Sequence, residues 1–191
     1  VLANTYRHPL TLSLTERLGL ADAGFQQRLM QSLESLGLLD RAVEYLPDDA
    51  TIAERVRAGE GLARPELAVL LAYGKLSLYE DLLHSATPDD PYLGRDLFDY
   101  FPKPLREGYP DAVASHRLRR EIIATILAND IINRGGPSFA VRRAEETGAD
   151  DATIASAFAA AFDSFRLGEL YADIDALDNR IDGKLQLDLY A

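Results

Sequence analysis

Apolar residues recur at helical spacing along most of the chain. Between residues 151 and 165 they form one stripe of a helix with a 3.6-residue period, made of Ile154, Ala157, Phe158, Ala161, Phe162 and Phe165. Asp150 or Asp151 is suited to cap the start of this helix. The same spacing resumes over residues 167–177 after a break near Gly168, so we expect a second helix that turns back on the first.

Two longer helices are predicted in the middle of the chain. Residues from about 65 to 84 carry leucine, valine and tyrosine on every side, and a helix that is apolar all round usually lies at the centre of a domain. Residues from about 116 to 133 carry isoleucine and leucine on one broad face, and Gly135, Gly136 and Pro137 end this helix. The pattern predicts an all-α fold, a multi-helix orthogonal or bundle-like domain around these two helices.

The remaining segments predict shorter elements. Helices are expected over residues 25–36 and 50–57, and the proline-rich stretch 88–110 should form a compact connector of short helices. Its apolar residues favour burial: Tyr92, Leu93, Leu97, Phe98, Tyr100 and Phe101. The apolar residues of segment 185–189 alternate as in a strand and also fit the spacing of a helix. We favour a helix, because no second strand is available to pair with this segment.

We expect one domain over residues 1–191. A softer join near Ser85 to Asp90 divides it into N-terminal helices, residues 1–85, and C-terminal helices, residues 90–191. Because the sequence starts at Val1 and its only methionine is Met30, we interpret it as a piece of a longer protein.

Composition narrows the function classes. The 191 residues contain no cysteine, which excludes disulfides, thiolate catalysis and cysteine-ligated metals. The net charge of −11 argues against general nucleic-acid binding. No stretch approaches the roughly 20 apolar residues of a membrane helix, so we expect no membrane association and a cytoplasmic location.

Charge is unevenly distributed along the chain, with a local net charge of +3 over residues 102–120 and −8 over residues 144–191. These segments could pair within the fold or dock against a partner.

Enzyme motifs are absent from the sequence. It contains neither a dinucleotide-binding nor a P-loop glycine pattern, and its paired glycines (Gly59 with Gly61, Gly135 with Gly136) fit helix ends. The three histidines lie far apart, in no metal-binding spacing. We therefore expect no catalytic residue, no cofactor ligand and no metal ligand in this chain.

Five polar residues are candidates for a docking surface or a polar network. Asn129 and Asn133 continue the apolar stripe of the 116–133 helix, and Arg134 follows them. Buried amides need hydrogen bonds, so they either bond to backbone at a neighbouring helix end or loop, or form a docking or ligand surface with Arg134 at its rim. Arg119 and Arg120 either form a phosphate-binding cluster or pair with acids on adjacent helices.

Several long segments, in order, resemble a known family. They are GLLDRAVEYLPDD (Gly37 to Asp49), RPELAVLLAYGKLSLYEDLL (Arg64 to Leu83), DDPYLGRDLFDYFPKPLRE (Asp89 to Glu107), HRLRREIIATILANDIINRGG (His116 to Gly136), AEETGAD (Ala144 to Asp150) and ALDN (Ala176 to Asn179). Together they resemble the C-terminal region of the large bacterial NAD-specific glutamate dehydrogenases. Members of that family often have Thr or Ser where this chain has Ala63, which removes the hydroxyl of a capping box that ends at Glu66.

The resemblance implies a multi-domain oxidoreductase that converts L-glutamate, NAD and water to 2-oxoglutarate, ammonia and NADH. It also implies that NAD and the glycine-flanked catalytic lysine belong to a domain that this sequence does not contain. We therefore expect a non-catalytic C-terminal helical domain whose partner is the catalytic domain of the same polypeptide, with a homo-oligomer left open. The family's helices continue past Ala191, which predicts fraying of the last dozen residues. The alternative is a stand-alone helical interaction or regulatory module.

Overall fold

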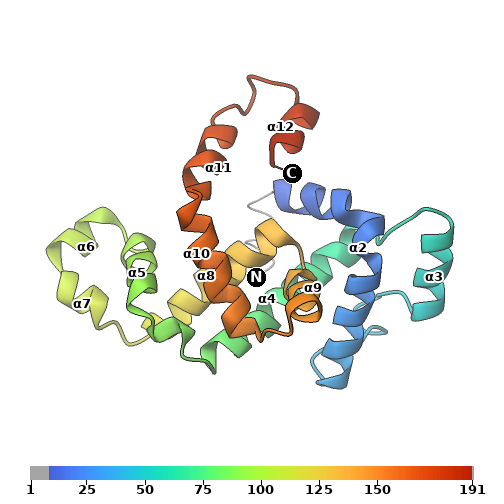
Figure 1. Ribbon diagram of the computed structural model, residues 1–191, viewed down its shortest axis with the longest axis horizontal. Coiled ribbons are helices and arrows are strands. Elements are labelled where there is room, and N and C mark those ends of the chain that lie inside the picture. Colours follow the sequence, from blue (N-terminus) through green and yellow to red (C-terminus); the bar gives the residue numbers. More distant parts are fainter. Residues whose placement is uncertain (1–8, 191) are drawn as a thin grey trace.

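The computed structural model describes residues 9–190, and no β-strand occurs among them (Figure 1). The all-α prediction is confirmed. The elements are α2 (Pro9–Ser35), α3 (Asp49–Arg57), α4 (Arg64–Leu83), η1 (Thr87–Asp89), η2 (Pro91–Leu93), α5 (Gly94–Tyr100), α6 (Lys103–Gly108), α7 (Pro110–Ala114), α8 (Arg119–Gly135), α9 (Phe139–Thr147), α10 (Asp151–Ser164), α11 (Leu167–Asp175) and α12 (Gly183–Tyr190).

Helix α4 lies at the centre of the domain, as its apolar pattern predicts, and its bounds agree with the prediction to within one residue. It packs most extensively against α8 and then against α2. Leu71, Leu78 and Leu82 join a hydrophobic core shared with α5, α8 and α10. Leu67 and Leu70 join a second core shared with α2 and α3. A helix buried on opposite sides by two cores must be apolar all round, which explains its sequence.

Helix ends follow the local chemistry of the sequence. Asp150 is the N-cap of α10, where its carboxylate accepts the Thr153 amide at 2.8 Å. Helix α8 ends in Gly136, whose φ of 86° favours glycine. At the start of α4 the Glu66 carboxylate accepts the Ala63 amide at 2.6 Å, but Ala63 has no side-chain oxygen to accept a hydrogen bond in return. This capping box is therefore half formed.

Two predicted boundaries are wrong. Helix α8 begins at Arg119 instead of residue 116, because the His116 ring nitrogen accepts the Leu118 amide at 3.2 Å and holds that backbone in a turn. Helix α2 begins at Pro9 instead of residue 25, and it breaks at Gly19, where φ is 24° and ψ is −109°. The helix is therefore kinked at this glycine. Helix α9 has no counterpart in the prediction.

The connector between α4 and α8 contains short helices, as predicted. Leu93 and Leu97 are buried in it, and Phe98 and Phe101 are half-buried. The expected burial of Tyr92 and Tyr100 is wrong, because both rings are exposed. The helices α5, α6 and α7 lie on one flank of the domain, so their outer faces have no neighbour to cover them (Figure 1).

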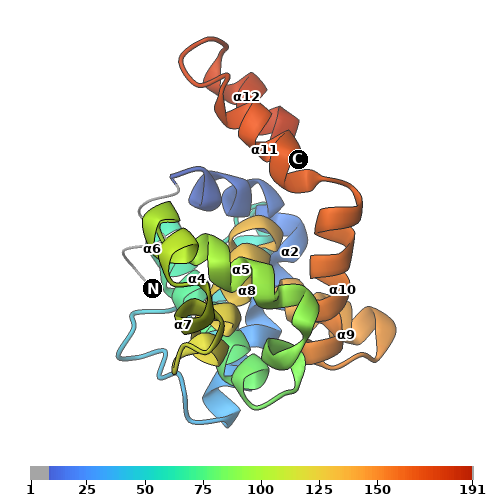
Figure 2. The same ribbon diagram turned by 90° about the vertical axis from the view of Figure 1, so that its left-hand side faces the viewer.

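The C-terminal helices form an arm that projects from the body (Figure 2). Arg166 adopts a left-handed conformation with φ of 52°, and α11 continues away from α10 there, so the predicted return of this helix is wrong. Helix α12 is the element that turns back, and Asp188 pairs with Arg17 of α2 at 2.5 Å. The helical form of residues 185–189 is confirmed. Phe165, expected on the buried stripe, is 76% exposed.

Candidate functional site around Arg134

Arg134, near the carboxyl end of α8, lies between two aromatic rings. Its guanidinium carbon is 4.7 Å from the ring centre of Phe162 in α10 and 4.3 Å from that of Tyr171 in α11. Asp130, one turn earlier in α8, lies 3.6 Å from the guanidinium. Each cation–π contact is worth roughly 0.5–2 kcal/mol. Arg134 therefore ties three helices together at the base of the arm.

The two rings belong to a longer row of aromatic side chains. Ring centres are 5.8 Å apart for Phe158 and Phe162, 6.0 Å for Phe162 and Tyr171, and 5.5 Å for Tyr171 and Tyr190, and these three pairs are stacked. Phe139 of α9 meets Phe158 edge to face, with ring centres 5.9 Å apart. The row thus runs from α9 through α10 and α11 to α12. At its outer end the Tyr190 hydroxyl donates to Asp175, and burial together with that carboxylate raises the pKa of Tyr190.

The Asn133 Oδ1 atom, next to Arg134, is buried without a hydrogen-bond partner. Asn129 is half-buried. The backbone bond expected for Asn133 is therefore absent at this oxygen atom.

Arg119 and Arg120 both pair with Asp89 of η1. Arg120 also donates to the backbone oxygens of Leu83 at 2.8 Å and Ser85 at 3.0 Å, so it satisfies carbonyls at the end of α4. These arginines fasten the end of α4 to the start of α8. Both guanidinium groups pair with an acid of a neighbouring element, which is the local pairing that was weighed against a phosphate-binding cluster.

The five predicted residues do not form one surface. Arg120 and Arg134 lie at opposite ends of the single helix α8. At 1.5 Å per residue, the fourteen steps between them place the two Cα atoms about 21 Å apart. The structure brings Arg134 to the base of the arm and places Arg119 and Arg120 at the connector.

A buried lysine was missed by the sequence analysis. Lys75, in the middle of α4, is 3% exposed, and its ammonium has no hydrogen-bond partner. Burial lowers its pKa from 10.5 to about 8, and the negative charge of Asp130 opposes that shift only in part. The signal was present in the sequence, since Lys75 falls between Leu71 and Leu78 on a helix that is apolar all round.

A polar contact joins α2 to the start of α9. The Ser138 hydroxyl donates to the carboxylate of Asp22, and Arg142 donates to the same carboxylate at 3.2 Å. Asp22 and Ser138 are both buried. The contact spans residues more than a hundred positions apart, so it holds the two cores of the domain together.

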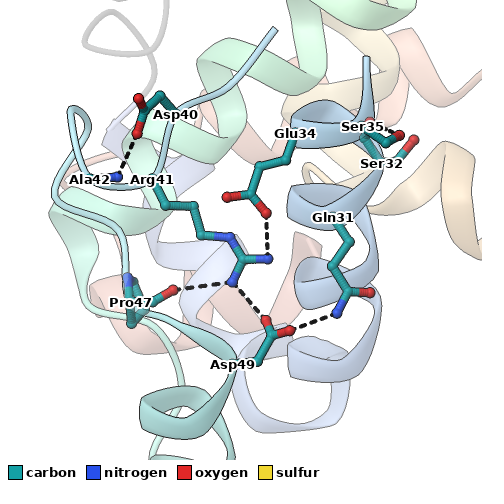
Figure 3. Close-up of polar contacts among 9 residues, drawn as sticks. All are labelled: Gln31, Ser32, Glu34, Ser35, Asp40, Arg41, Ala42, Pro47 and Asp49. Atoms are coloured by element: carbon teal, nitrogen blue, oxygen red, sulfur yellow. Dashed lines mark hydrogen bonds and ion pairs between the residues drawn. The ribbon is translucent and has the colours of Figure 1, made fainter. Parts of the chain in front are cut away.

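Arg41 organises the loop between α2 and α3 (Figure 3). Its guanidinium lies 2.8 Å from Glu34 and 2.6 Å from Asp49, and it donates to the Pro47 carbonyl at 3.3 Å. Hydrogen bonds from Arg41 and from Gln31 lower the pKa of Asp49. A single guanidinium therefore fixes the loop against both of its flanking helices.

The groups described above join helices to one another. Within residues 9–190 no group of three or more His, Cys, Asp or Glu side chains is placed to hold a metal ion. The same residues contain no strand from which a strand–loop–helix dinucleotide cradle could be built. No helix in the described part of the chain is long and apolar enough to span a membrane.

Comparison with known proteins identifies the family. The family model described as "Glutamate dehydrogenase, C-terminal" matches residues 59–191. The chain belongs to this glutamate dehydrogenase C-terminal family.

Individual relatives agree with the family. The chain is similar to the NAD-specific glutamate dehydrogenase of Pseudomonas aeruginosa, at 44% identity over 189 residues, 99% of this chain and 12% of the relative. It is also similar to the Halomonas elongata protein of the same name, at 42% identity over 186 residues, which cover 97% of this chain and 12% of the relative. The Mycobacterium tuberculosis protein of the same name is 38% identical over 138 residues, which cover 72% of this chain and 8% of the relative. The domain thus spans about an eighth of the length of the first two relatives. The predicted family is confirmed.

Proposed function

We propose that this chain is a non-catalytic helical scaffold domain of a large NAD-dependent glutamate dehydrogenase. One observation carries the proposal: 99% of the chain aligns with 12% of a relative named NAD-specific glutamate dehydrogenase. In this proposal the parent enzyme is cytoplasmic and converts L-glutamate, NAD and water to 2-oxoglutarate, ammonia and NADH. The reaction takes place in a separate catalytic domain of the same polypeptide, which also binds NAD.

The contacts within the chain support a scaffold role. Arg134 joins α8 to the arm, Arg120 joins α4 to α8, and Arg41 joins α2 to α3. Charged groups used in this way stiffen the domain and leave few donors free for a substrate. A rigid body of this kind can hold a neighbouring catalytic domain in a productive geometry, or join subunits of a homo-oligomer.

Three proteins test the proposal: the full-length enzyme, the same enzyme without these 191 residues, and the 191-residue chain alone. We expect glutamate-dependent NAD reduction from the full-length enzyme only, and no NAD binding by the chain alone in calorimetry. The shortened enzyme should lose kcat or its native mass in light scattering. Glutamate oxidation by the chain alone would refute the non-catalytic assignment, and unchanged kcat, KM and native mass of the shortened enzyme would refute the scaffold role.

The alternative function, a stand-alone regulatory module that senses an amino acid through Asn129, Asn133 and Arg134, has less support. Such a sensor needs an accessible guanidinium, whereas that of Arg134 lies between two rings. Calorimetric titration of the chain with glutamate and other amino acids distinguishes the two functions. Saturable binding that is lost in Asn133→Ala would favour the sensor.

A further inference from the structure

The loop between α2 and α3 displays large apolar side chains to solvent. We define the apolar loop as residues Leu36–Leu46. Four of its side chains are strongly exposed: Leu36 at 63%, Leu38 at 49%, Val43 at 66% and Tyr45 at 91%. Single exposed hydrophobic residues are ordinary, but several gathered in one short loop are typical of an interaction site.

The backbone of the apolar loop is fixed from inside. Leu39 and Leu46 are buried in the core with Met30 and Leu33 of α2. Arg41 holds the loop through the contacts drawn in Figure 3, and Glu44 accepts the Tyr73 hydroxyl at 2.7 Å. The exposed side chains therefore stand on a pre-ordered backbone, which reduces the entropy that docking must overcome.

Tyr45 adds an independent sign of function. Its φ of 55° lies in the left-handed region, which is disfavoured for a residue with a Cβ atom. Its side chain has no place in the core of this domain that would compensate for the strain. Strained residues that persist cluster at functional sites, where a partner makes use of the conformation.

Charge and chain length indicate the partner. Residues 34–54 contain six acidic residues and one basic residue, Arg41, which pairs with Glu34 and Asp49. An apolar cluster with an acidic surround is complementary to an apolar recess that is bordered by Lys and Arg. The relatives extend far beyond the aligned region, since this domain spans 12% of their length.

We propose that the apolar loop docks into an apolar, basic-rimmed recess on the remainder of its own dehydrogenase polypeptide. This inference rests on the proposed function, because it requires that the chain is a domain of the larger enzyme. It assigns Val43 and Tyr45 as the central contacts and Arg41 as the residue that positions them.

The test is site-specific photocrosslinking in the full-length enzyme. A benzophenone amino acid replaces Tyr45, and a matched variant carries it at Tyr109, which is also strongly exposed but lies on the flank formed by α6 and α7. Mixed light and heavy isotope labelling separates crosslinks within one polypeptide from those between copies. We expect the probe at position 45 to give crosslinks within one polypeptide to residues outside these 191, at least tenfold above the probe at position 109.

Three results overturn the inference: crosslinking at position 45 no stronger than at 109, crosslinking only between copies, or crosslinking only to other proteins. A second variant, Val43→Ser with Tyr45→Gly, separates docking from folding. The circular dichroism spectrum of the full-length enzyme should not change, because both side chains are exposed and glycine accepts the backbone of Tyr45. In the full-length enzyme, hydrogen exchange of residues 36–46 should become at least tenfold faster.

The two proposals fail in different ways. If the enzyme requires these 191 residues for activity but gives no crosslink at position 45, the scaffold role stands and docking of the apolar loop is refuted. A full-length protein that does not oxidise glutamate refutes the proposed function, whatever the crosslinks show.

Discussion

Lys75 is the residue whose replacement tests the packing of this domain most directly. It is 3% exposed in the middle of α4, its ammonium has no hydrogen-bond partner, and its pKa falls from 10.5 to about 8. A pKa that is lower in the folded state means that folding disfavours the charged form. At about 1.4 kcal/mol per pKa unit, the difference corresponds to a penalty of roughly 3 kcal/mol at neutral pH.

The sign of the pH dependence follows from the two pKa values. Below pH 8 the amine is charged in both the folded and the unfolded chain, so the full penalty is present. As pH rises from 8 to 10.5 the folded amine is already neutral and the unfolded one loses its proton, so the penalty disappears. Asp130 is the nearby acid that favours the charged amine, and it offsets only part of the effect of burial on the pKa of Lys75.

Replacement of Lys75 by Met keeps the side-chain length and removes the charge. The free energy of unfolding of Lys75→Met, from urea titration, should exceed that of the wild type by about 3 kcal/mol at pH 7. The same linkage gives about 2 kcal/mol at pH 9 and about 1 kcal/mol at pH 10. Lys184→Met, at an exposed lysine of α12, is the control and should change stability by less than ~0.5 kcal/mol. A wild type more stable than Lys75→Met at pH 7, or a difference that stays constant up to pH 10, refutes this reasoning.

Three further substitutions test local features of the fold. Ala63→Ser supplies the missing oxygen of the capping box with Glu66 and should raise the free energy of unfolding by about 1 kcal/mol in urea titration, whereas an unchanged value would mean that Glu66 already satisfies this helix end. Gly135→Ala places a Cβ atom against the ring and Cβ of Phe139, so it should destabilise the chain by about 1–3 kcal/mol and lower its melting temperature, while Gly183→Ala, in open space, serves as the control. Burial and the nearby Asp81 raise the pKa of Asp151 from 3.8 to about 6, so its charged form is disfavoured in the folded chain above pH 6 and this penalty vanishes below about pH 4. Asp151→Asn should therefore gain stability relative to the wild type as pH rises from 4 to 7, and a difference that is flat over this range contradicts the raised pKa.

Local sequence patterns predict the positions of most helices. The spacing that gives α4 and α10 is local, and a residue such as Asp150 caps its helix through atoms three positions away. Where the local signal was interrupted, the prediction failed. Gly19 kinks α2, and His116 holds its own backbone outside α8. The family was also accessible from sequence, because it depends on long ordered segments and not on geometry.

Tertiary packing sets which of these residues meet. Spacing placed Phe165 on a buried stripe, but α10 has no neighbour there and the ring is exposed. The position of Arg134 between Phe162 and Tyr171 depends on how α10 and α11 cross the end of α8, and the isolation of Lys75 depends on two cores that close around α4. Local spacing sets which face of a helix is apolar, whereas the packing of residues far apart in the chain sets which part of that face is covered.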